Sequence, residues 1–288
     1  MPIKESELIL NPDGSIYHLN LLPTDIANTI ITVGDPDRVV SVSKHFDTIE
    51  VKKHKREFNT HTGTYKGKRI TVISTGIGTD NIDIVFNELD ALVNIDFDTR
   101  EIKKELTSLD IIRIGTSGAI QSNIPINSFL ISELAVGFDS LLHFYDSQHV
   151  QNEVLSQDII QQTNWFDKKS EPYVVSANSG LVNQFKSDKT VIGFTATNVG
   201  FYGPQGRVLR LQTQDNNLND KLAKFESNGK QITNLEMETA GIYGLASLLG
   251  HKALSLNAIL ANRATGQFSD TPTETVDRLI TYTLNRLI

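Results

Sequence analysis

Short β-rich runs alternate with amphipathic helical patterns along this 288-residue chain. The runs that predict strands are residues 29–33, 51–58, 60–65, 69–74, 110–115, 128–133, 173–177, 190–195 and 253–261. The patterns that predict helices begin at Pro36 and after Gly78, or cover residues 149–163, 236–249 and 273–287. After Gly78, apolar residues recur at a spacing typical of a helix that lies on a sheet. Helices interleaved with buried strands predict a layered α/β/α domain.

The length of the chain allows a large core, and α/β folds of this size often form one domain. We therefore predict a single domain over residues 1–288. Residues 1–16 are expected to be an N-terminal extension, and the polar, charged segment 94–108 an inserted excursion.

Charge and cysteine content exclude several classes of protein. Lysine and arginine number 27 against 34 acidic residues, so neither nucleic acid nor a membrane surface is expected as a partner. The absence of cysteine excludes disulfides, thiolate nucleophiles and cysteine-bound zinc. No apolar run could span a bilayer, and residues 1–7 lack the apolar core of a signal peptide. We expect a soluble, cytoplasmic protein.

A glycine- and proline-containing loop, residues 201–207, combines an aromatic ring, an amide and a guanidinium group. Gln205 offers one acceptor and two donors in a plane, Arg207 offers donors only, and Phe201 offers a stacking face. The complement is a flat heterocycle with carbonyl groups and a ring N–H, such as uracil. An ordinary surface turn would have the same composition, and this segment alone does not separate the two interpretations.

An anion site is indicated at Gly34-Asp35-Pro36-Asp37-Arg38, directly after the first strand. Asp35 can cap a helix that begins at Pro36, and free backbone N–H groups at a helix start attract phosphate. The helix dipole disfavours Arg38 in the first turn unless an anion neutralises it. The alternative is a plain capped helix with a solvated arginine.

A second arginine, Arg113, lies in an apolar strand and is followed by a glycine-hydroxyl segment, residues 115–118. An arginine flanked by isoleucines is seldom a casual surface residue, so we assign it a function. Neither arginine segment matches a Walker loop, and Gly76-Ile77-Gly78 lacks the third glycine of a dinucleotide fingerprint. Nucleoside triphosphates and nicotinamide cofactors are therefore excluded.

Two carboxylates, Glu236 and Glu238, flank Met237 where a β-rich run meets a helical pattern. Residues two apart point to different sides of a helix, so we expect only one carboxylate to face a pocket, where it would suit sugar hydroxyl groups. Both could instead be acids that stabilise a first helical turn. Glycosidase chemistry needs carboxylates on both sides of the scissile bond, which neighbouring residues do not provide.

Taken together and in order, these segments resemble those of the uridine phosphorylases in the nucleoside phosphorylase family. The resemblance runs from about Tyr17 to the C-terminus and also includes Arg56-Glu57-Phe58. It implies a three-layer α/β/α sandwich around a mixed central β-sheet. Ordered segments spread over one chain are more specific than any single short motif.

The resemblance also implies roles for individual residues. The phosphate-binding residues that it implies are Gly34, Arg38, Arg113, Thr116 and, from a neighbouring subunit, Arg56. Those for the base are Phe201, Gln205 and Arg207, and those for the ribose are Glu236, Met237, Glu238 and, from the adjacent subunit, His18. Arg113, Arg207 and Glu238 are the expected catalytic residues. A dimer, or a hexamer built from dimers, is expected to share its active sites in this way.

The chain departs from the family pattern at several positions. Gly203 precedes Pro204 where the family usually has the reverse order, and Gly206 replaces a larger residue. Glu57, Ile77 and Asn81 match a monovalent-cation site of some bacterial members, but Asn81 stands where serine is usual, which argues against the ion. No cofactor or other metal is expected, and phosphate is the co-substrate.

The activity that the resemblance implies is reversible phosphorolysis of uridine to uracil and ribose 1-phosphate, in pyrimidine salvage and nucleoside catabolism. A phosphate nucleophile requires no serine, cysteine or metal from the protein. The alternatives are phosphorolysis of thymidine, deoxyuridine or a purine nucleoside, hydrolysis of the same bond by water, and nucleoside binding without turnover.

Overall fold

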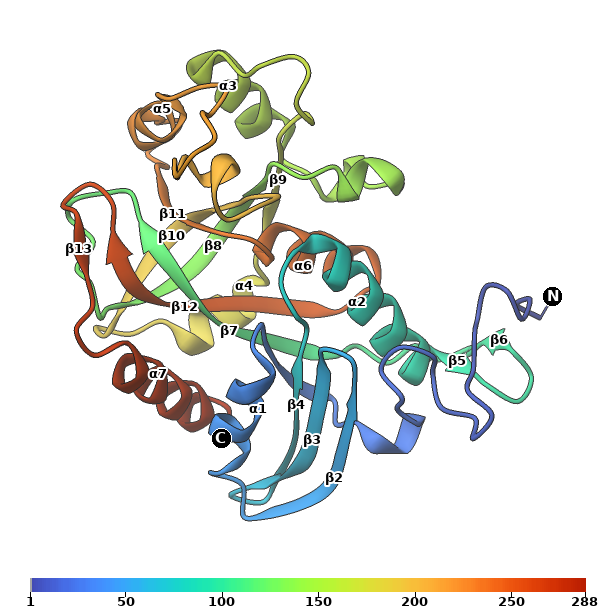
Figure 1. The fold of residues 1–288 in the computed structure, drawn as a ribbon. Helices are drawn as coiled ribbons and strands as arrows, with labels where there is room; N and C mark the ends of the chain where they lie inside the picture. Colours follow the sequence, from blue (N-terminus) through green and yellow to red (C-terminus); the bar gives the residue numbers. More distant parts are fainter. Residues whose placement is uncertain (1) are drawn as a thin grey trace.

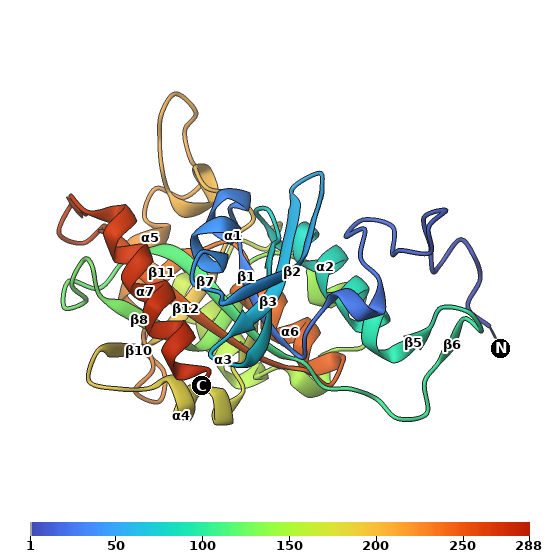
Figure 2. The ribbon, with the colours of Figure 1, turned by 90° about the horizontal axis from the view of Figure 1, so that it is seen from below.

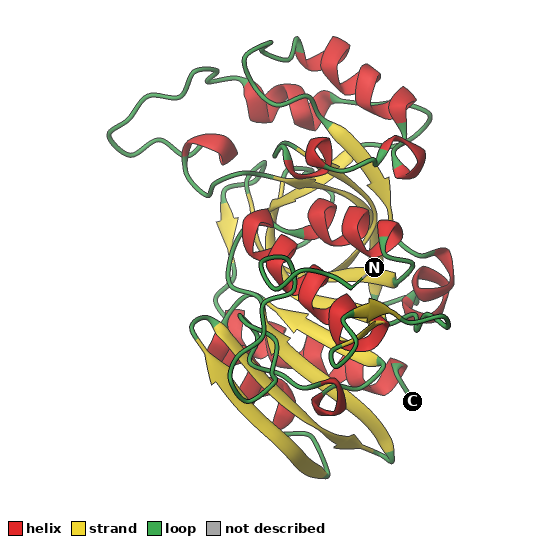
Figure 3. Ribbon diagram, turned by 90° about the vertical axis from the view of Figure 1, so that its right-hand side faces the viewer, coloured by secondary structure: helices red, strands yellow, loops and turns green. Residues whose placement is uncertain are grey.

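The computed structural model describes residues 2–288 and shows a mixed β-sheet with helices on both faces (Figures 1 and 3). In these residues the main sheet has eleven strands, in the order β13-β12-β8-β10-β11-β7-β1-β4-β3-β2, and β9 pairs with β8. The strands are β1 (Thr29–Val33), β2 (Thr48–Lys55), β3 (Phe58–Tyr65), β4 (Lys68–Ser74), β7 (Asp110–Ala119), β8 (Phe129–Gly137), β9 (Tyr173–Ser176), β10 (Thr190–Thr197), β11 (Ile232–Glu236), β12 (Lys252–Asn262) and β13 (Gln267–Phe268).

The helices form two outer layers because strand residues alternate between the faces of the sheet. They are α1 (Pro36–Ser43), α2 (Thr79–Asn94), α3 (Glu153–Thr163), α4 (Ser179–Phe185), α5 (Leu218–Lys224), α6 (Thr239–Leu248) and α7 (Pro272–Arg286). Ile30 packs in the core under α2 and α6, whereas Ile31 packs in the core under α1, α4 and α7. The predicted three-layer architecture is confirmed.

Five of the strands close into a ring, which the sequence pattern does not predict. β12 pairs in parallel with β7 and antiparallel with β8, so β8, β10, β11, β7 and β12 return on themselves. Within β12, Leu256 lies beside both Ile114 of β7 and Ile131 of β8. The ring brings the ends of β7, β11 and β12 together at one place.

Most predicted elements are present, with altered bounds. The strand 29–33 and the helix at Pro36 are confirmed, and the Asp35 side chain accepts a hydrogen bond from the backbone N–H of Asp37. The predicted strand 51–58 is wrong at its end, because a turn at Arg56 (φ 55°) separates β2 from β3. The predicted strand 110–115 is too short, because the glycine-hydroxyl segment 115–118 is not a loop: β7 continues to Ala119 and pairs with β12 throughout.

The segment 94–108 is tied to the N-terminal extension. It forms a small hairpin of β5 (Ile95–Asp96) and β6 (Glu101–Ile102), which lies beside the N-terminal residues in Figures 1 and 2. Arg100 donates to the carbonyl oxygens of Ile3 at 2.8 Å and Lys4 at 3.1 Å. The division into one domain over residues 1–288 stays a prediction, and residue 1 lies outside the described residues.

Across residues 2–288, none of the helices combines the length and the apolar character that crossing a bilayer requires.

Candidate functional site

A cavity of about 790 Å³ opens at the carboxyl ends of β1 and β4, beside the last residues of β7, β11 and β12. Ligands of open α/β sheets bind at this edge of the strands. Ten of the predicted site residues line it: Gly34, Arg38, Arg113, Thr116, Phe201, Gln205, Arg207, Glu236, Met237 and Glu238. The fold thus brings together segments that are up to 204 residues apart in the sequence (34 to 238).

Two guanidinium groups of like charge line the cavity. Arg38, in the first turn of α1, donates to the carbonyl oxygen of Ile114 at 3.4 Å, which directs its side chain across β1 toward β7. Burial, together with the nearby charge of Arg113, lowers the pKa of Arg38 from its ordinary value. Two cations that face one cavity beside Gly34 and Thr116 favour an anion between them.

Arg113 is held by protein groups in the floor of the cavity. Its Nη1 donates to Asn257 Oδ1 at 3.0 Å and Ser255 Oγ at 3.3 Å. Its Nη2 donates to Glu238 Oε2 at 2.6 Å and lies 3.2 Å from Glu236 Oε2. Burial opposes its charge, but the two carboxylates outweigh burial and raise the pKa of Arg113. The guanidinium group is therefore charged and fixed in position.

The expectation that only one carboxylate faces the pocket is wrong. Glu236 and Glu238 both line the cavity and both approach Arg113, because Glu236 ends β11 and Glu238 precedes α6. Their bonding differs, however. Glu236 accepts from the N–H groups of Glu238 and Thr239 and from the Thr197 and Thr239 hydroxyl groups, as a cap for α6 would.

Glu238 carries fewer bonds and is the more available carboxylate. It accepts from Arg113 and, through Oε1, from the backbone N–H of Gly78 at 2.9 Å. Burial, with the Glu236 charge in addition, raises the pKa of Glu238, and Arg113 opposes the rise. A carboxylate so placed can accept a further hydrogen bond from a hydroxyl group in the cavity.

The aromatic–amide–guanidinium group that the loop predicts also lines the cavity. Arg207 lies over the Phe201 ring, 3.7 Å from its centroid, and donates to Gln205 Oε1 at 2.6 Å. Arginine can only donate, so Gln205 turns its oxygen toward Arg207 and keeps its amide N–H groups for a ligand. Gln205 is 3% exposed although it lies in a short turn, Gly203–Gln205, which argues against an ordinary surface turn.

Two residues that sequence reasoning missed hold this loop. Asn219 of α5 donates to the Gln205 carbonyl oxygen at 2.9 Å, and Arg263 donates to the same oxygen and to that of Gly206. Gly206 has φ 67°, and a Cβ atom there would lie 2.4 Å from Asn219 Nδ2, which explains why no larger residue stands there. An arginine directly after a buried strand end is the signal that could have revealed Arg263.

The two residues expected to serve a neighbouring subunit lie outside the cavity of their own chain. Arg56 is exposed in the β2–β3 turn, and the His18 side chain is 27% exposed beside α2. They are joined through Lys55, whose Nζ donates to the Tyr17 carbonyl oxygen and lies 4.6 Å from the Tyr17 ring centroid. Arg56 and His18 thus belong to one stretch of surface.

Residues 28–285 match the family model described as "Phosphorylase superfamily". The chain belongs to the phosphorylase superfamily. Among its relatives is a uridine phosphorylase of Thermococcus kodakarensis, 32% identical over 262 residues that cover 89% of this chain and 80% of the relative. A purine nucleoside phosphorylase of the DeoD type from Bacillus subtilis is 25% identical over 251 residues, which cover 87% of this chain and 88% of the relative.

A solved structure shows the same fold over almost the whole length of this phosphorylase. It is a nucleoside phosphorylase of Trypanosoma brucei, described as showing uridine phosphorylase activity. The TM-score is 0.88 at 30% sequence identity, and the match covers 98% of this chain and 99% of the other.

The residues that match a monovalent-cation site of other members lie together. Glu57, Ile77 and Asn81 all line the cavity. The Asn81 amide donates to the Ile77 carbonyl oxygen at 3.4 Å, so this oxygen already accepts an N–H. Within residues 2–288, no group of three or more histidine, aspartate or glutamate side chains is arranged to hold a metal ion.

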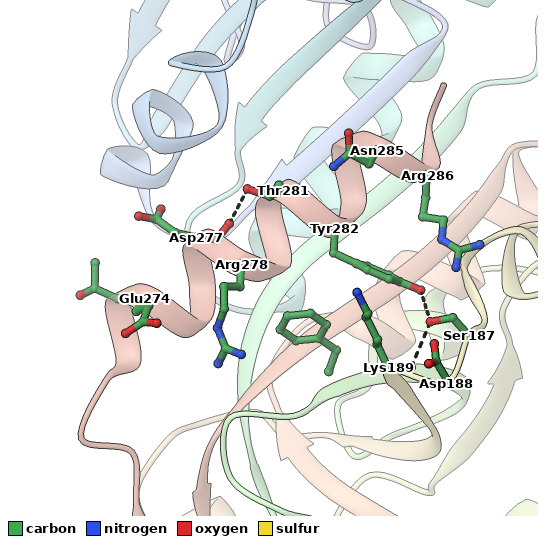
Figure 4. Close-up of a pocket in the computed structure, with 12 residues that line it drawn as sticks. Ser187, Asp188, Lys189, Glu274, Asp277, Arg278, Thr281, Tyr282, Asn285 and Arg286 are labelled. Atoms are coloured by element: carbon green, nitrogen blue, oxygen red, sulfur yellow. Dashed lines mark hydrogen bonds between the residues drawn. The ribbon is translucent and has the colours of Figure 1, made fainter.

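A larger cavity of about 1140 Å³ lies elsewhere, between α7 and the turn Ser187–Lys189 (Figure 4). Two of its charged groups have partners on the surface: Asp277 pairs with Lys44 at 3.1 Å, and Arg278 donates to Thr275 Oγ1 at 3.2 Å. None of the predicted site residues lines it. Size alone therefore does not identify the functional site of this phosphorylase.

Proposed function

We propose that this chain catalyses the reversible phosphorolysis of uridine, giving uracil and ribose 1-phosphate. The observation that carries the proposal is the set of groups in one cavity: two arginines, a carboxylate bound to one of them, and an amide–guanidinium pair with an aromatic face. These groups match the phosphate, the ribose and the pyrimidine base of one reaction. The uridine phosphorylase activity named for two relatives supports the same substrate.

In this proposal, Gly34, Thr116 and the arginines bind phosphate between the two strand ends. Arg38 and Arg113 supply the positive charge, and Arg113 also links the phosphate region to Glu238 at 2.6 Å. Glu238 accepts from a ribose hydroxyl group, Met237 packs against the sugar, and Glu236 fixes the backbone at the start of α6. Positioning two reactants in this way lowers the barrier without a protein nucleophile.

The chemical step transfers the ribosyl group from nitrogen to oxygen. A phosphate oxygen forms a bond to C1′ while the C1′–N1 bond breaks, and its electron pair leaves with the uracil ring, which then takes a proton from solvent. The ribose carries positive charge in the transition state, and the bound phosphate stabilises it. Gln205 and Arg207 donate to the carbonyl oxygens of the departing uracil, where negative charge gathers.

Arg207 is charged while it does this, although its surroundings disfavour the charge. Burial, followed by the nearby Arg263, lowers the pKa of Arg207 from its ordinary value. A developing uracil anion would relieve this repulsion between the two arginines. The contact is therefore stronger in the transition state than with neutral uridine.

Phosphate is the co-substrate in this proposal, and no cofactor or monovalent cation is required. Asn81, which stands where serine is usual in the family, argues against the cation. We also propose a cytoplasmic enzyme of pyrimidine salvage that self-associates as a dimer or a hexamer of dimers. The exposed Arg56 and the half-buried His18, both outside their own chain's cavity, support sites shared between subunits.

A panel of uridine, thymidine, deoxyuridine and inosine, assayed with and without phosphate, tests the proposal. We expect ribose 1-phosphate from uridine and no release of uracil without phosphate. Uracil release at full rate in phosphate-free buffer would show hydrolysis instead. Binding of uridine without any product would show a non-catalytic binder, and faster turnover of inosine would show a purine phosphorylase.

A further inference from the structure

One carboxylate, that of Glu88 in α2, contacts three polar groups of the segment His18–Leu19. Its oxygens accept from the backbone N–H of His18 at 3.0 and 3.1 Å and from that of Leu19 at 2.8 Å. Glu88 Oε1 also lies 2.6 Å from His18 Nδ1. The Glu88 side chain is 13% exposed, so it is largely withdrawn from water and fixed against this one segment.

The short Nδ1 contact sets the proton on the imidazole ring. A carboxylate accepts only, so Nδ1 carries the hydrogen, and Nε2 of the neutral ring is left as an acceptor. Within residues 2–288, Nε2 has no hydrogen-bond partner, and the ring is 27% exposed. The Tyr17 ring packs edge-on against it at 4.7 Å between centroids, which limits its rotation. In its neutral form, His18 thus presents one acceptor in one orientation.

The same helix connects this histidine to the cavity of its own chain. Gly78 at the start of α2 donates to Glu238, and Glu88 lies ten residues farther along, about 15 Å at the rise of an α-helix. A rigid helix of this kind keeps the two positions at a constant distance. Lys55, next to Arg56, holds the Tyr17 carbonyl oxygen on the same surface.

The family resemblance implies that His18 reaches the ribose 5′ hydroxyl group in the site of a neighbouring subunit. We propose that Glu88 is a positioning residue for that contact: it fixes the tautomer and orientation of His18, so that Nε2 accepts a hydrogen bond from the 5′ group. This inference rests on the proposed function and adds to it a selectivity for a donor at the 5′ position. A carboxylate that only stabilised the 17–19 segment would not affect that selectivity.

Two substrate analogues and one spectroscopic measurement separate the two roles. A 5′-ammonium group donates but cannot accept, whereas 5′-deoxyuridine does neither. With the unaltered enzyme we expect kcat/KM for 5′-amino-5′-deoxyuridine to exceed that for 5′-deoxyuridine by about ten-fold. Imidazole ¹⁵N spectra of histidine-labelled protein should show the His18 hydrogen on Nδ1.

The decisive variant is Glu88→Gln, which keeps an oxygen for the backbone N–H groups but can turn its amide N–H₂ toward Nδ1. We expect the hydrogen of His18 to move to Nε2 and the preference for the 5′-amino compound to fall about ten-fold, while kcat/KM for 5′-deoxyuridine changes less than about two-fold. In a His18→Ala background, Glu88→Gln should change neither the preference for the 5′-amino compound nor kcat/KM for 5′-deoxyuridine. Glu101→Gln, on the exposed β6, is the matched control.

Each result is decisive. An unchanged preference in folded Glu88→Gln would overturn the inference and leave Glu88 as a stabiliser of the segment. Should that variant not fold, an Nε2-protonated His18 in the unaltered enzyme would overturn it equally. Failure of the unaltered enzyme to cleave any nucleoside would refute the proposed function, whereas normal uridine phosphorolysis without the expected preference would refute this inference alone.

Discussion

The guanidinium group of Arg113 lies directly over Gly115, two residues along the same strand. A Cβ atom on Gly115 would come within 1.8 Å of Arg113 Nη1 and 2.4 Å of its Cζ. Side chains two apart share a face of a strand, so only glycine leaves room for the guanidinium group to reach Glu238 and Asn257. The position of the second cation in the cavity therefore depends on a residue that has no side chain.

Gly115→Ala should act like a substitution of Arg113. The added methyl group must displace the guanidinium group, and we expect kcat/KM for uridine to fall by about 100-fold, the loss of one positioned charge. Steady-state kinetics with varied phosphate measure this, and KM for phosphate should rise as well. Gly67→Ala, in a turn outside the cavity where φ is 80° and a Cβ atom meets nothing within 4 Å, is a control for the backbone strain of replacing a glycine. Equal activity of Gly115→Ala and the unaltered enzyme would contradict the role of Arg113.

Arg207→Ala should lower turnover and not only affinity. The guanidinium group faces a base that becomes negative as the bond breaks, so we expect kcat to fall by about 100-fold with a smaller change in KM. Arg210→Ala, which removes an exposed arginine from the same loop, should leave kcat within about two-fold. A near-normal kcat in Arg207→Ala would remove this residue from the mechanism.

The acid limb of the pH profile should report Glu238. Burial raises the pKa of Glu238 above its ordinary value of 4.5, and the ionised form is the one that accepts from a ribose hydroxyl group. We therefore expect kcat/KM for uridine to fall as the pH decreases through a value above 4.5. In Glu238→Gln the activity should be low and this limb absent. A limb that is unchanged in Glu238→Gln would assign it to another group.

Mixing two inactive variants should restore activity if sites are shared. Arg56→Ala removes the residue that a chain contributes to the site of its neighbour, whereas Glu238→Ala damages the chain's own site. In a mixed dimer one site has both residues intact, so random exchange of subunits should restore about a quarter of the full activity. The measurement is uridine phosphorolysis before and after mild dissociation and reassociation. Arg56→Ala with full activity by itself would contradict the shared site.

Tyr173→Phe should destabilise the fold in a pH-dependent way. The Tyr173 hydroxyl lies 2.8 Å from both oxygens of the buried Asp139, and its loss leaves that carboxylate short of a donor. We expect the free energy of unfolding to fall by about 1–3 kcal/mol at neutral pH. Burial raises the pKa of Asp139, so its protonated form is favoured in the folded state and stability from this group is lost as the pH rises through that pKa. Urea unfolding at a series of pH values should therefore show a defect that becomes smaller as the pH is lowered through the raised pKa of Asp139.

The local parts of the site follow from short stretches of sequence. Asp35 caps α1 through the backbone N–H of Asp37, two residues away, so the strand–cap–helix pattern at 29–38 is predictable from spacing alone. The Phe201–Arg207 group is equally local, because its contacts span no more than six residues. The alternation of strands and helices also fixes the layers, since each element must bury one face.

The long-range parts of the site do not follow from spacing. The expectation that one carboxylate would face the pocket was wrong because both Glu236 and Glu238 turn toward Arg113, more than 120 residues earlier in the chain. Arg263 was missed because its partners, the carbonyl oxygens of the loop after Phe201, have no signature in the sequence. Glu88 was missed for the same reason, since it contacts His18 across about 70 residues.

By itself the sequence determines the fold class and the chemical groups of the cavity, because hydrophobic periodicity and local capping act over a few residues. Only the tertiary structure decides which groups meet. Closure of β12 against both β7 and β8 places Asn257 beside Arg113, and the start of α2 brings the Gly78 N–H to Glu238. These contacts depend on how the strands and helices pack, which is a property of the whole chain and not of any segment.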